Sequence, residues 1–417
     1  MNIMYSSRLI SRSFEFGLPT LHLNFGRWLN GLVSAVSGLR ISYGWWVNIT
    51  NDRVEKATDR VETNGQVSET NIYKALVGDH HIRLLALHPK EGDDILRGEL
   101  LACTIFSHAD FSIVPAPPYT ALSYCWGEPT FSDAILLGNT PFPITPSLGR
   151  CLRTLWAENG EGRMLWVDQI CINQDDIGEK SHQVGMMDSI YAEAKCVTVW
   201  LGEASEYSDT GMQVLHYFAS THRPSDAAPW RTLPPEVVRE GLRDVMSRPW
   251  FSRRWVVQEV ALSQKTRMIC GSSTFSWPSN DVLRVQTFMR MIKYAEILPA
   301  WLDRGLSEVS MQPLLMLLDL HVGRQLDRSF GTSHRPAADI LDIAYDLRHR
   351  LSSDPRDRVF ALQGLSKDLN HEPIEPDYKM TLEQVYEHLS RLIDSRWPSA
   401  EEFEADMAGR MALWRKK

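Results

Sequence analysis

The pattern of hydrophobic and polar positions divides the chain into three parts. Residues 52–70 are polar and charged, and we assign residues 1–70 to a poorly ordered N-terminal extension and linker. Between residues 71 and 265, short apolar runs alternate with amphipathic stretches, which predicts strands interleaved with helices. Beyond this point helical spacing dominates, and we predict a mostly α-helical region over residues 266–417.

The apolar runs predict a series of strands. HIRLLALHP and ELLACTIF are expected to pair, YTALSYCWG stops at Gly127 and Pro129, and AILLGNTPFPIT is typical of a hairpin around Gly138-Asn139. MLWVDQICI and CVTVWLG follow as strands, and the second is apolar enough for the middle of a covered parallel sheet. TRMICGSSTFSW, residues 266–277, predicts a further strand pair.

Helical patterns lie between and after these strands. Ser147 is a candidate cap for a helix before MLWVDQICI, and Asp176 with Glu179 forms a capping-box-like start for a helix near 177–194. The order helix–strand–helix–strand over 147–202 favours an α/β fold with a central, mainly parallel sheet flanked by helices. Thr381 and Gln384 predict a further capping box. The remaining helices are predicted at 208–220, 235–247, 252–263, 280–296, 311–325, 336–351, 355–364 and 382–395.

Charge and cysteine content narrow the class of protein. The net charge is −8 and no run of Lys or Arg is present, which argues against a nucleic-acid partner. The six cysteines are widely spaced without a CxxC pair, which argues against zinc and favours reduced thiols in the cytoplasm. No phosphate-binding glycine motif occurs, so we predict no metal and no bound cofactor.

The first 51 residues suggest an alternative location. They contain four arginines, one acid and many serines, which is faintly typical of a mitochondrial transit segment. An apolar stretch within them, WLNGLVSAVSGL, is 12 residues long and too short to cross a bilayer. We therefore expect a cytoplasmic protein without a membrane span, with a mitochondrial location as the weaker alternative.

The segment LWVDQICINQDD, residues 165–176, places polar side chains in an apolar strand. Read as a strand, Asp168 shares a face with Trp166 and Ile170. Polar groups at the carboxyl ends of parallel strands line ligand crevices, so Asp168 is a candidate catalytic acid and Asn173 a candidate ligand contact. The favoured alternative is structural, with Asp168 accepting hydrogen bonds, Asn173 holding the turn and Asp176 capping the helix.

Glu259 is the second candidate acid. In RRWVVQEVAL it lies among apolar residues, where a carboxylate is costly to bury unless Arg253 or Arg254 pairs with it. A buried Arg–Glu tie is favoured over general acid–base or oxocarbenium-stabilising chemistry. Trp126, Trp255 and Arg254 are candidate ligand contacts, although tryptophans in such runs more often fill a core.

Two cysteines are candidate nucleophiles of lower rank. Cys171 or Cys125 would need activation by a histidine, and His182 is the one nearby in the sequence. Packing within the core is the favoured role for both thiols.

Four segments together resemble a known family. They are YTALSYCWGEP (119–129), LWVDQICINQDD with the following helix and strand (165–202), RPWFSRRWVVQEVALS (248–263), and DPRDRVFALQGL (354–365) followed by EPDYKMTLEQVY. In order, spacing and tryptophan content they are similar to the fungal heterokaryon incompatibility (HET) domain. The domain-like part is about 73–263, and the later segments match the helical region that often follows it.

This resemblance implies a function in programmed cell death after fusion of unlike fungal cells, or in fungal innate immunity. It also implies a TIR-like α/β fold, which serves elsewhere as a signalling adaptor or cleaves NAD. We therefore expect a signalling protein with protein partners or self-association through the HET domain. The alternatives are an NAD- or nucleotide-cleaving enzyme using Glu259 or Asp168, or an inactive paralogue.

Overall fold

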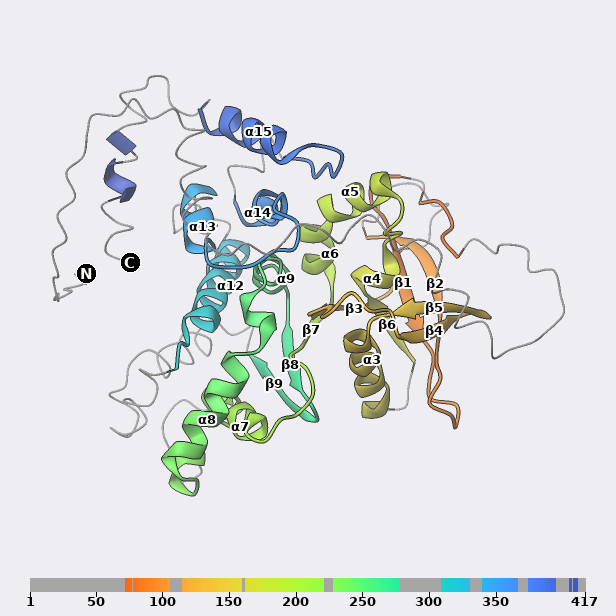
Figure 1. Cartoon of the computed structure of the whole chain (residues 1–417), viewed down its shortest axis with the longest axis vertical. Helices are drawn as coiled ribbons and strands as arrows, with labels where there is room; N and C mark the ends of the chain where they lie inside the picture. The colour runs from red at the N-terminus through yellow and green to blue at the C-terminus, as the bar shows by residue number, and fades with distance from the viewer. Residues whose placement is uncertain are drawn as a thin grey trace. The chain divides into compact units, whose positions relative to one another are not determined.

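The computed structural model describes residues 72–76, 78–105, 115–159, 162–220, 228–277, 309–330, 340–366, 374–394, 405–406 and 408–411. The predicted extension over 1–70 and the helix predicted at 280–296 lie outside the described residues. Within the described part, nine strands form one sheet in the order β5-β4-β2-β1-β6-β3-β7-β8-β9 (Figure 1). Helices cover this sheet, which confirms the α/β class.

The strands of the sheet follow the apolar runs of the sequence. They are β1 (His81–Leu87), β2 (Leu96–Thr104), β3 (Thr120–Tyr124), β4 (Asp133–Leu137), β5 (Thr140–Ile144), β6 (Arg163–Trp166), β7 (Cys196–Trp200), β8 (Thr266–Cys270) and β9 (Ser273–Trp277). The central strands β6, β3, β7 and β8 are parallel, whereas β1–β2, β4–β5 and β8–β9 are antiparallel pairs. In β3 and β7 every residue after the first is buried, as a parallel strand covered on both faces requires.

Two predicted hairpins are present. β4 and β5 join through Gly138, whose φ of +60° is the left-handed conformation that a tight hairpin turn requires. β8 and β9 form the strand pair expected over 266–277, and β8 pairs with β7, so the sheet continues past residue 265.

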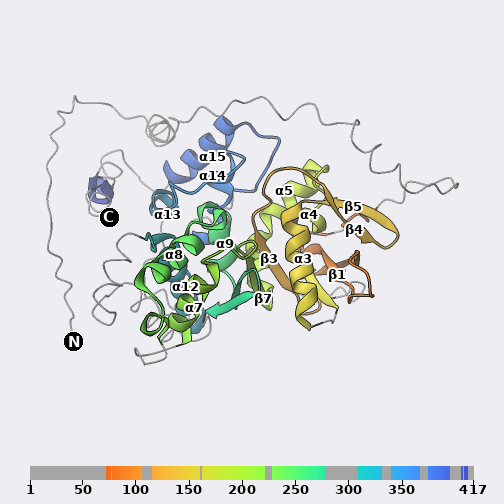
Figure 2. The same cartoon turned by 60° about the horizontal axis from the view of Figure 1, so that its bottom comes forward.

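The helices are α3 (Pro146–Asn159), α4 (Asp168–Cys171), α5 (Ile177–Gly185), α6 (Met187–Glu193), α7 (Ser208–Ser220), α8 (Pro235–Met246), α9 (Val256–Ala261), α12 (Gln312–Phe330), α13 (Ile340–Asp346), α14 (Asp357–Phe360) and α15 (Leu382–Asp394). Short 3₁₀ turns, η2 (Pro249–Ser252) and η4 (Gln363–Leu365), precede and follow some of them. Figure 2 shows α7 beside α8, and Gly211 and Gly241 allow this contact because a Cβ on Gly211 would lie 2.1 Å from the Gly241 carbonyl oxygen.

The predicted strand MLWVDQICI is wrong beyond Trp166. The carbonyl of Val167 accepts hydrogen bonds from the amides of Ile170 and Cys171, at 3.0 and 2.7 Å, so the chain turns into α4 directly after β6. The alternating faces assigned to Trp166, Asp168 and Ile170 therefore do not exist. Local hydrogen bonding of this turn outweighs the apolar pattern, which cannot separate a short helix from a strand.

Helix starts were predicted with mixed success. Asp176 caps α5 by accepting from the amides of Gly178 and Glu179, and Thr381 and Gln384 form the expected reciprocal pair before α15. Ser147 does not cap α3, because that helix begins at Pro146 and the Ser147 hydroxyl donates to the Cys125 carbonyl at 2.6 Å. Proline suits a first helical position because its missing amide has no partner there.

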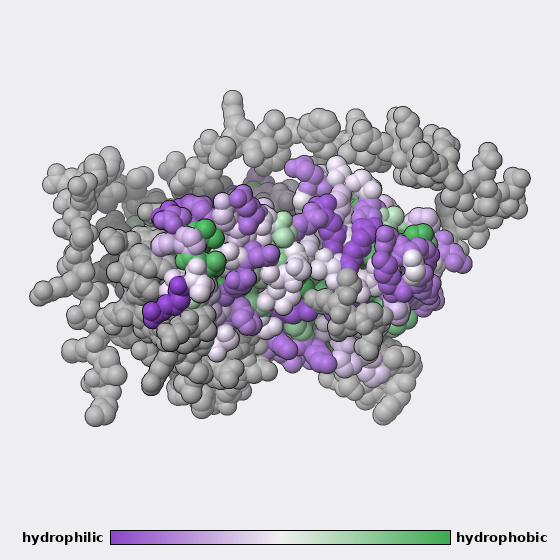
Figure 3. All heavy atoms as spheres, turned by 90° about the horizontal axis from the view of Figure 1, so that it is seen from below, coloured by the Kyte–Doolittle hydropathy of each residue, from purple (hydrophilic) through white to green (hydrophobic). Residues whose placement is uncertain are grey.

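The face shown in Figure 3 is predominantly hydrophilic, with hydrophobic residues in small separate patches. No helix among the described residues combines the length and apolar character needed to cross a membrane.

Candidate functional site

The carboxyl ends of two central parallel strands position the candidate site. β3 ends at Tyr124 and β6 at Trp166, and they pair in parallel through Thr120–Leu165 and Ala121–Trp166. Residues that leave these strands, Trp126 and Asp168, consequently emerge at one edge of the sheet. α9, which carries Glu259, packs near the same edge, where the Ser123 hydroxyl donates to the Glu259 carboxylate.

Asp168 is held by donors on both carboxylate oxygens. The indole of Trp126 donates to Oδ2 at 2.9 Å, and the backbone amide of Gln169 donates to Oδ1 at 2.8 Å. The side chain remains partly exposed. Burial nevertheless raises the pKa of Asp168, and Arg253, Trp126 and Tyr124 oppose that rise. The hydrogen bonds of the favoured structural interpretation are thus present, on a carboxylate whose pKa is raised by burial although the residue as a whole is partly exposed.

Glu259 is enclosed more completely, with 3% of its surface exposed. The Ser123 hydroxyl that donates to it accepts a hydrogen bond from the Trp250 indole at 2.8 Å, so two neutral donors form a chain that ends on the Glu259 carboxylate. Burial raises the pKa of Glu259 to about 7, although Arg253 and Ser123 lower it. Glu259 can therefore hold or release a proton near neutral pH.

Arg253 is the cation of this site. Its guanidinium donates to the Tyr124 carbonyl at the end of β3 and lowers the pKa of both Asp168 and Glu259. One arginine thus faces two carboxylates, and we call Asp168, Arg253, Glu259 and Ser123 the acid cluster. Of the two arginines proposed as partners of Glu259, Arg253 is the one whose charge lowers the pKa of Glu259.

Arg254 turns toward a different part of the fold. Its guanidinium donates to the Leu347 carbonyl at 3.0 Å, and the residue is 4% exposed. Trp255 is partly exposed and lies beside Asp357, far along the chain. Asn173 lies in the turn before α5, where its side chain accepts from the Asp175 amide at 3.3 Å. These three candidates are not brought together with Asp168, whereas Trp126 is.

Sequence reasoning missed Ser123 and Tyr124. They occur in apolar runs and lack any local sign of chemistry. The available signal was indirect: a carboxylate predicted amid apolar neighbours needs donors, and Ser123 is one of the hydroxyl side chains of the strand YTALSYCWG.

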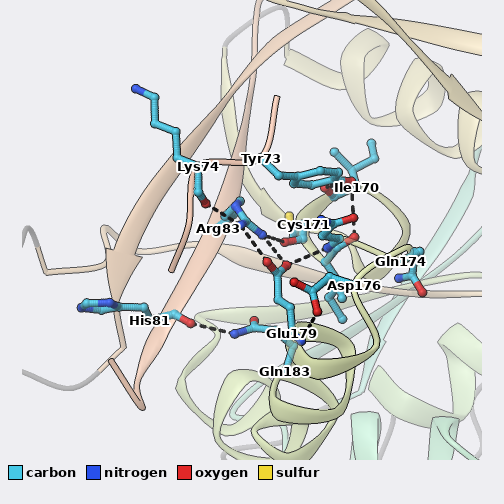
Figure 4. A network of polar contacts seen from close by, with 12 residues as sticks. Tyr73, Lys74, His81, Arg83, Ile170, Cys171, Gln174, Asp176, Glu179 and Gln183 are labelled. Atoms are coloured by element: carbon cyan, nitrogen blue, oxygen red, sulfur yellow. Dashed lines mark hydrogen bonds and ion pairs between the residues drawn. The ribbon is translucent and has the colours of Figure 1, made fainter. Parts of the chain in front are cut away.

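A second buried charge network contacts residues 170–173 of the LWVDQICINQDD segment (Figure 4). Arg83 of β1 makes a two-pronged ion pair with Glu179 of α5, at 2.5 and 2.9 Å. The same guanidinium donates to the carbonyls of Cys171 and Lys74, at 3.3 and 2.6 Å. The Asn173 amide donates to Glu179 at 2.7 Å, so the ion pair fixes the turn that follows α4.

Glu179 therefore does not complete a capping box. A box would require its side chain to return to the amide of Asp176, but the carboxylate is occupied by Arg83 and the amide of Asn173. The Tyr73 ring stacks on Arg83, 4.9 Å from the guanidinium carbon, and its hydroxyl donates to the carbonyls of Ile170 and Ile172. A packing contact from outside the segment thus holds both ends of this turn.

The thiols near the site are poor nucleophiles. Cys171 is fully buried, and burial raises its pKa to about 12; burial also raises the pKa of Cys125. His182 is exposed on α5. These observations support the packing role. Among the described residues, no three His, Cys, Asp or Glu side chains cluster in a way that could hold a metal ion.

Comparison with known proteins identifies the family to which the sequence is related. Residues 119–259 match the family model described as "Heterokaryon incompatibility protein (HET)". The chain belongs to the HET family. It is 31% identical over 371 residues to heterokaryon incompatibility protein 6, OR allele, of Neurospora crassa. That match includes 76% of this chain and 52% of the relative, so the chain spans about half the length of the curated relative it matches. No solved structure matches the chain.

Proposed function

We propose that this chain is a heterokaryon incompatibility signalling protein that promotes programmed cell death in fungi. Its HET domain would act in the cytoplasm through protein partners or self-association, as part of recognition between unlike cells or of innate immunity. The observation that carries this proposal is the position of the family match. Residues 119–259 contain every member of the acid cluster and end at Glu259.

The geometry favours signalling over catalysis in one respect. Glu259 is 3% exposed and is engaged by Ser123, so it meets protein donors rather than a solvent-facing substrate. Burial raises the pKa of the Cys171 and Cys125 thiols, and the hydrogen bonds of the Cys171 sulfur among the described residues are to backbone groups of Val167 and Leu165. A binding surface around Trp126 and Asp168 needs neither group to react.

A second candidate is cleavage of NAD or a related nucleotide, as in TIR-like enzymes. The supporting observation is the pKa of Glu259 near 7, beside the partly exposed Asp168 and Trp126. An acid that exchanges a proton near neutral pH suits general acid–base chemistry. Entry of a substrate would require the Ser123–Glu259 contact to open. An inactive paralogue is the third alternative.

The test is controlled expression of residues 1–417 in a fungal host, with viability and cellular NAD followed together. The matched variants are Asp168→Asn, Glu259→Gln and the control Glu193→Gln, an exposed acid at the end of α6. We expect death with wild type and control, without loss of NAD before viability falls. An early NAD loss that Glu259→Gln abolishes would support the enzyme instead, and absence of death would support the inactive paralogue.

A further inference from the structure

A segment that follows the HET match in the chain forms hydrogen bonds with the segment that contains Arg253, the cation of the acid cluster. Residues 347–357, here called the latch, follow α13 and lead into α14. Their partner is residues 251–255, Phe-Ser-Arg-Arg-Trp, which lead into α9. Residues 251–255 and 354–357 lie within motifs that resemble the family, about 100 residues apart in the chain, and residues 347–353 directly precede the second motif.

Every residue of 251–255 makes a polar contact with the latch. The Leu351 amide donates to the Ser252 carbonyl at 2.7 Å, and the Arg254 amide donates to the Leu351 carbonyl at 2.8 Å, which gives a short parallel bridge at Arg253. At the far end, Trp255 lies against Asp357. The side chain of Leu351 itself is 61% exposed, so the bridge is made by backbone and not by packing of that side chain.

Arg350 is the central residue of the latch. Its guanidinium donates to the carbonyls of Phe251 at 2.8 Å, Arg253 at 3.2 Å and Pro313 of α12 at 3.0 Å. It is 8% exposed, and its recorded hydrogen bonds in the described part of the chain go to carbonyl oxygens and not to a carboxylate. Burying a cation that binds carbonyl oxygens and no carboxylate is costly. We therefore infer that these hydrogen bonds fix the position of the backbone at residues 251–253.

The other end of the latch reaches α5. The hydroxyl of Tyr378 donates to Asp357 at 2.8 Å, and the Tyr378 amide donates to a second partner, the Ser181 hydroxyl on α5, at 3.2 Å. The ring of Tyr378 lies between Lys180 of α5 and Arg356, at 5.2 and 5.1 Å. The latch therefore connects the start of α9, which carries Arg253, with the helix that follows the Asp168 turn.

We propose that Arg350 is a positioning residue for Arg253, and that the latch lets the region after the HET match set the geometry of the acid cluster. This inference rests on the proposed function only in taking the acid cluster as the working site. The Arg253 guanidinium donates to the Tyr124 carbonyl and its charge lowers the pKa of both carboxylates, while Arg350 donates to the Arg253 backbone carbonyl. A partner that displaced the latch would release Arg253 and leave two carboxylates without their cation.

The test compares Arg350→Gln with Arg348→Gln. Arg348 lies in the same segment with the same charge, but within the described part of the chain its guanidinium contacts its neighbour Tyr345, through the carbonyl at 2.7 Å and the ring at 3.7 Å. The readout is the protonation midpoint of Glu259 in the full chain, followed by pH-dependent infrared difference spectroscopy. The Glu259 band is identified by its loss in Glu259→Gln.

We expect Arg350→Gln to move the Glu259 midpoint upward by about one pH unit, because Arg253, no longer held in place, lowers the pKa of Glu259 less, while Arg348→Gln leaves it unchanged. Arg350→Lys keeps the charge but cannot reach three carbonyls, so it should shift the midpoint in the same direction by less, and it decides the matter if Arg350→Gln does not fold. An unchanged midpoint in a folded Arg350 variant, or an equal shift in Arg348→Gln, overturns the proposal. Failure of the proposed function would appear separately, as wild-type expression without cell death.

Discussion

Two buried charge networks flank the turn between β6 and α5, and their composition differs. Arg83 and Glu179 balance one cation with one anion, and the backbone supplies the remaining partners of both. The acid cluster sets one cation, Arg253, against two carboxylates, whose other partners are a hydroxyl, an indole and an amide. The first network is suited to holding structure. The second leaves negative charge in excess, and burial raises the pKa of both its acids.

The comparison teaches that burial alone does not indicate function. Arg83 is 2% exposed and Glu259 3% exposed, yet only one of these networks has an unequal number of charges. An unequal number means that proton uptake can relieve the imbalance, so the acid cluster can respond to pH or to a ligand. The predictions below test this distinction, from the largest expected effect to the smallest.

Glu179→Gln is expected to have the largest effect on stability. It leaves the buried Arg83 guanidinium without its counter-charge, which costs about 4 kcal/mol of unfolding free energy. Denaturant unfolding measures this loss. Glu193→Gln, on an exposed position of α6, should change the unfolding free energy by less than about 0.5 kcal/mol. Equal losses in the two variants would remove the distinction between the networks.

The raised pKa values in the acid cluster predict that the free energy of unfolding falls as pH rises. The pKa of Glu259 is about 7 in the folded protein, above the ordinary value of 4.5 for a glutamate, so the folded state binds the proton more tightly. The contribution of Glu259 to the free energy of unfolding is complete below pH 4.5 and is lost as pH rises through 7. The loss is about 3 kcal/mol, since each unit of pKa difference corresponds to about 1.4 kcal/mol. Asp357, with a pKa of about 6, acts in the same direction.

Unfolding curves at intervals from pH 5 to pH 8 measure this dependence. Glu259→Gln keeps an acceptor for Ser123 but cannot ionise, so the decline toward pH 7 should flatten. A wild-type stability that increases over this interval would contradict the electrostatic account of the cluster.

Trp126→Phe is expected to affect Asp168 and not Glu259, the other acid of the cluster. It removes the indole donor to Asp168 at 2.9 Å, and we expect a loss of about 1.5 kcal/mol and a higher pKa for Asp168. Glu259, which Trp126 does not contact, should keep its protonation midpoint. A shift of both acids together would show that they titrate as one coupled unit.

Asp176→Ala, at the start of the helix that carries Glu179 of the first network, is expected to have the smallest effect on stability. It removes the cap that bonds the amides of Gly178 and Glu179, at 2.9 and 3.0 Å, and should cost about 1 kcal/mol. Thermal unfolding checks this value. If the loss equals that of Glu179→Gln, the helix start and not the ion pair holds the turn.

The sequence by itself determined most of the local structure. Alternating and continuous apolar runs predicted the strands of both hairpins and β7, and the caps at Asp176 and Thr381 follow from side chains that bond amides two or three residues away. These features depend on near neighbours, so the pattern of near neighbours contains them. It also identified Asp168 and Glu259 as acids in unusual surroundings.

The tertiary structure alone decided which groups these acids meet. In the folded protein, β6 ends at Trp166 and Glu179 forms an ion pair with Arg83. Arg253 belongs to the acid cluster, whereas Arg254 binds the Leu347 carbonyl elsewhere. Each of these partners comes from an element distant in the chain, and adjacent arginines in one sequence look alike until the fold points them in different directions. Arg350 shows the same limit, since its three carbonyl partners lie on η2, its edge and α12. Long-range hydrogen bonding is set by packing of whole elements, and a one-dimensional pattern does not encode it.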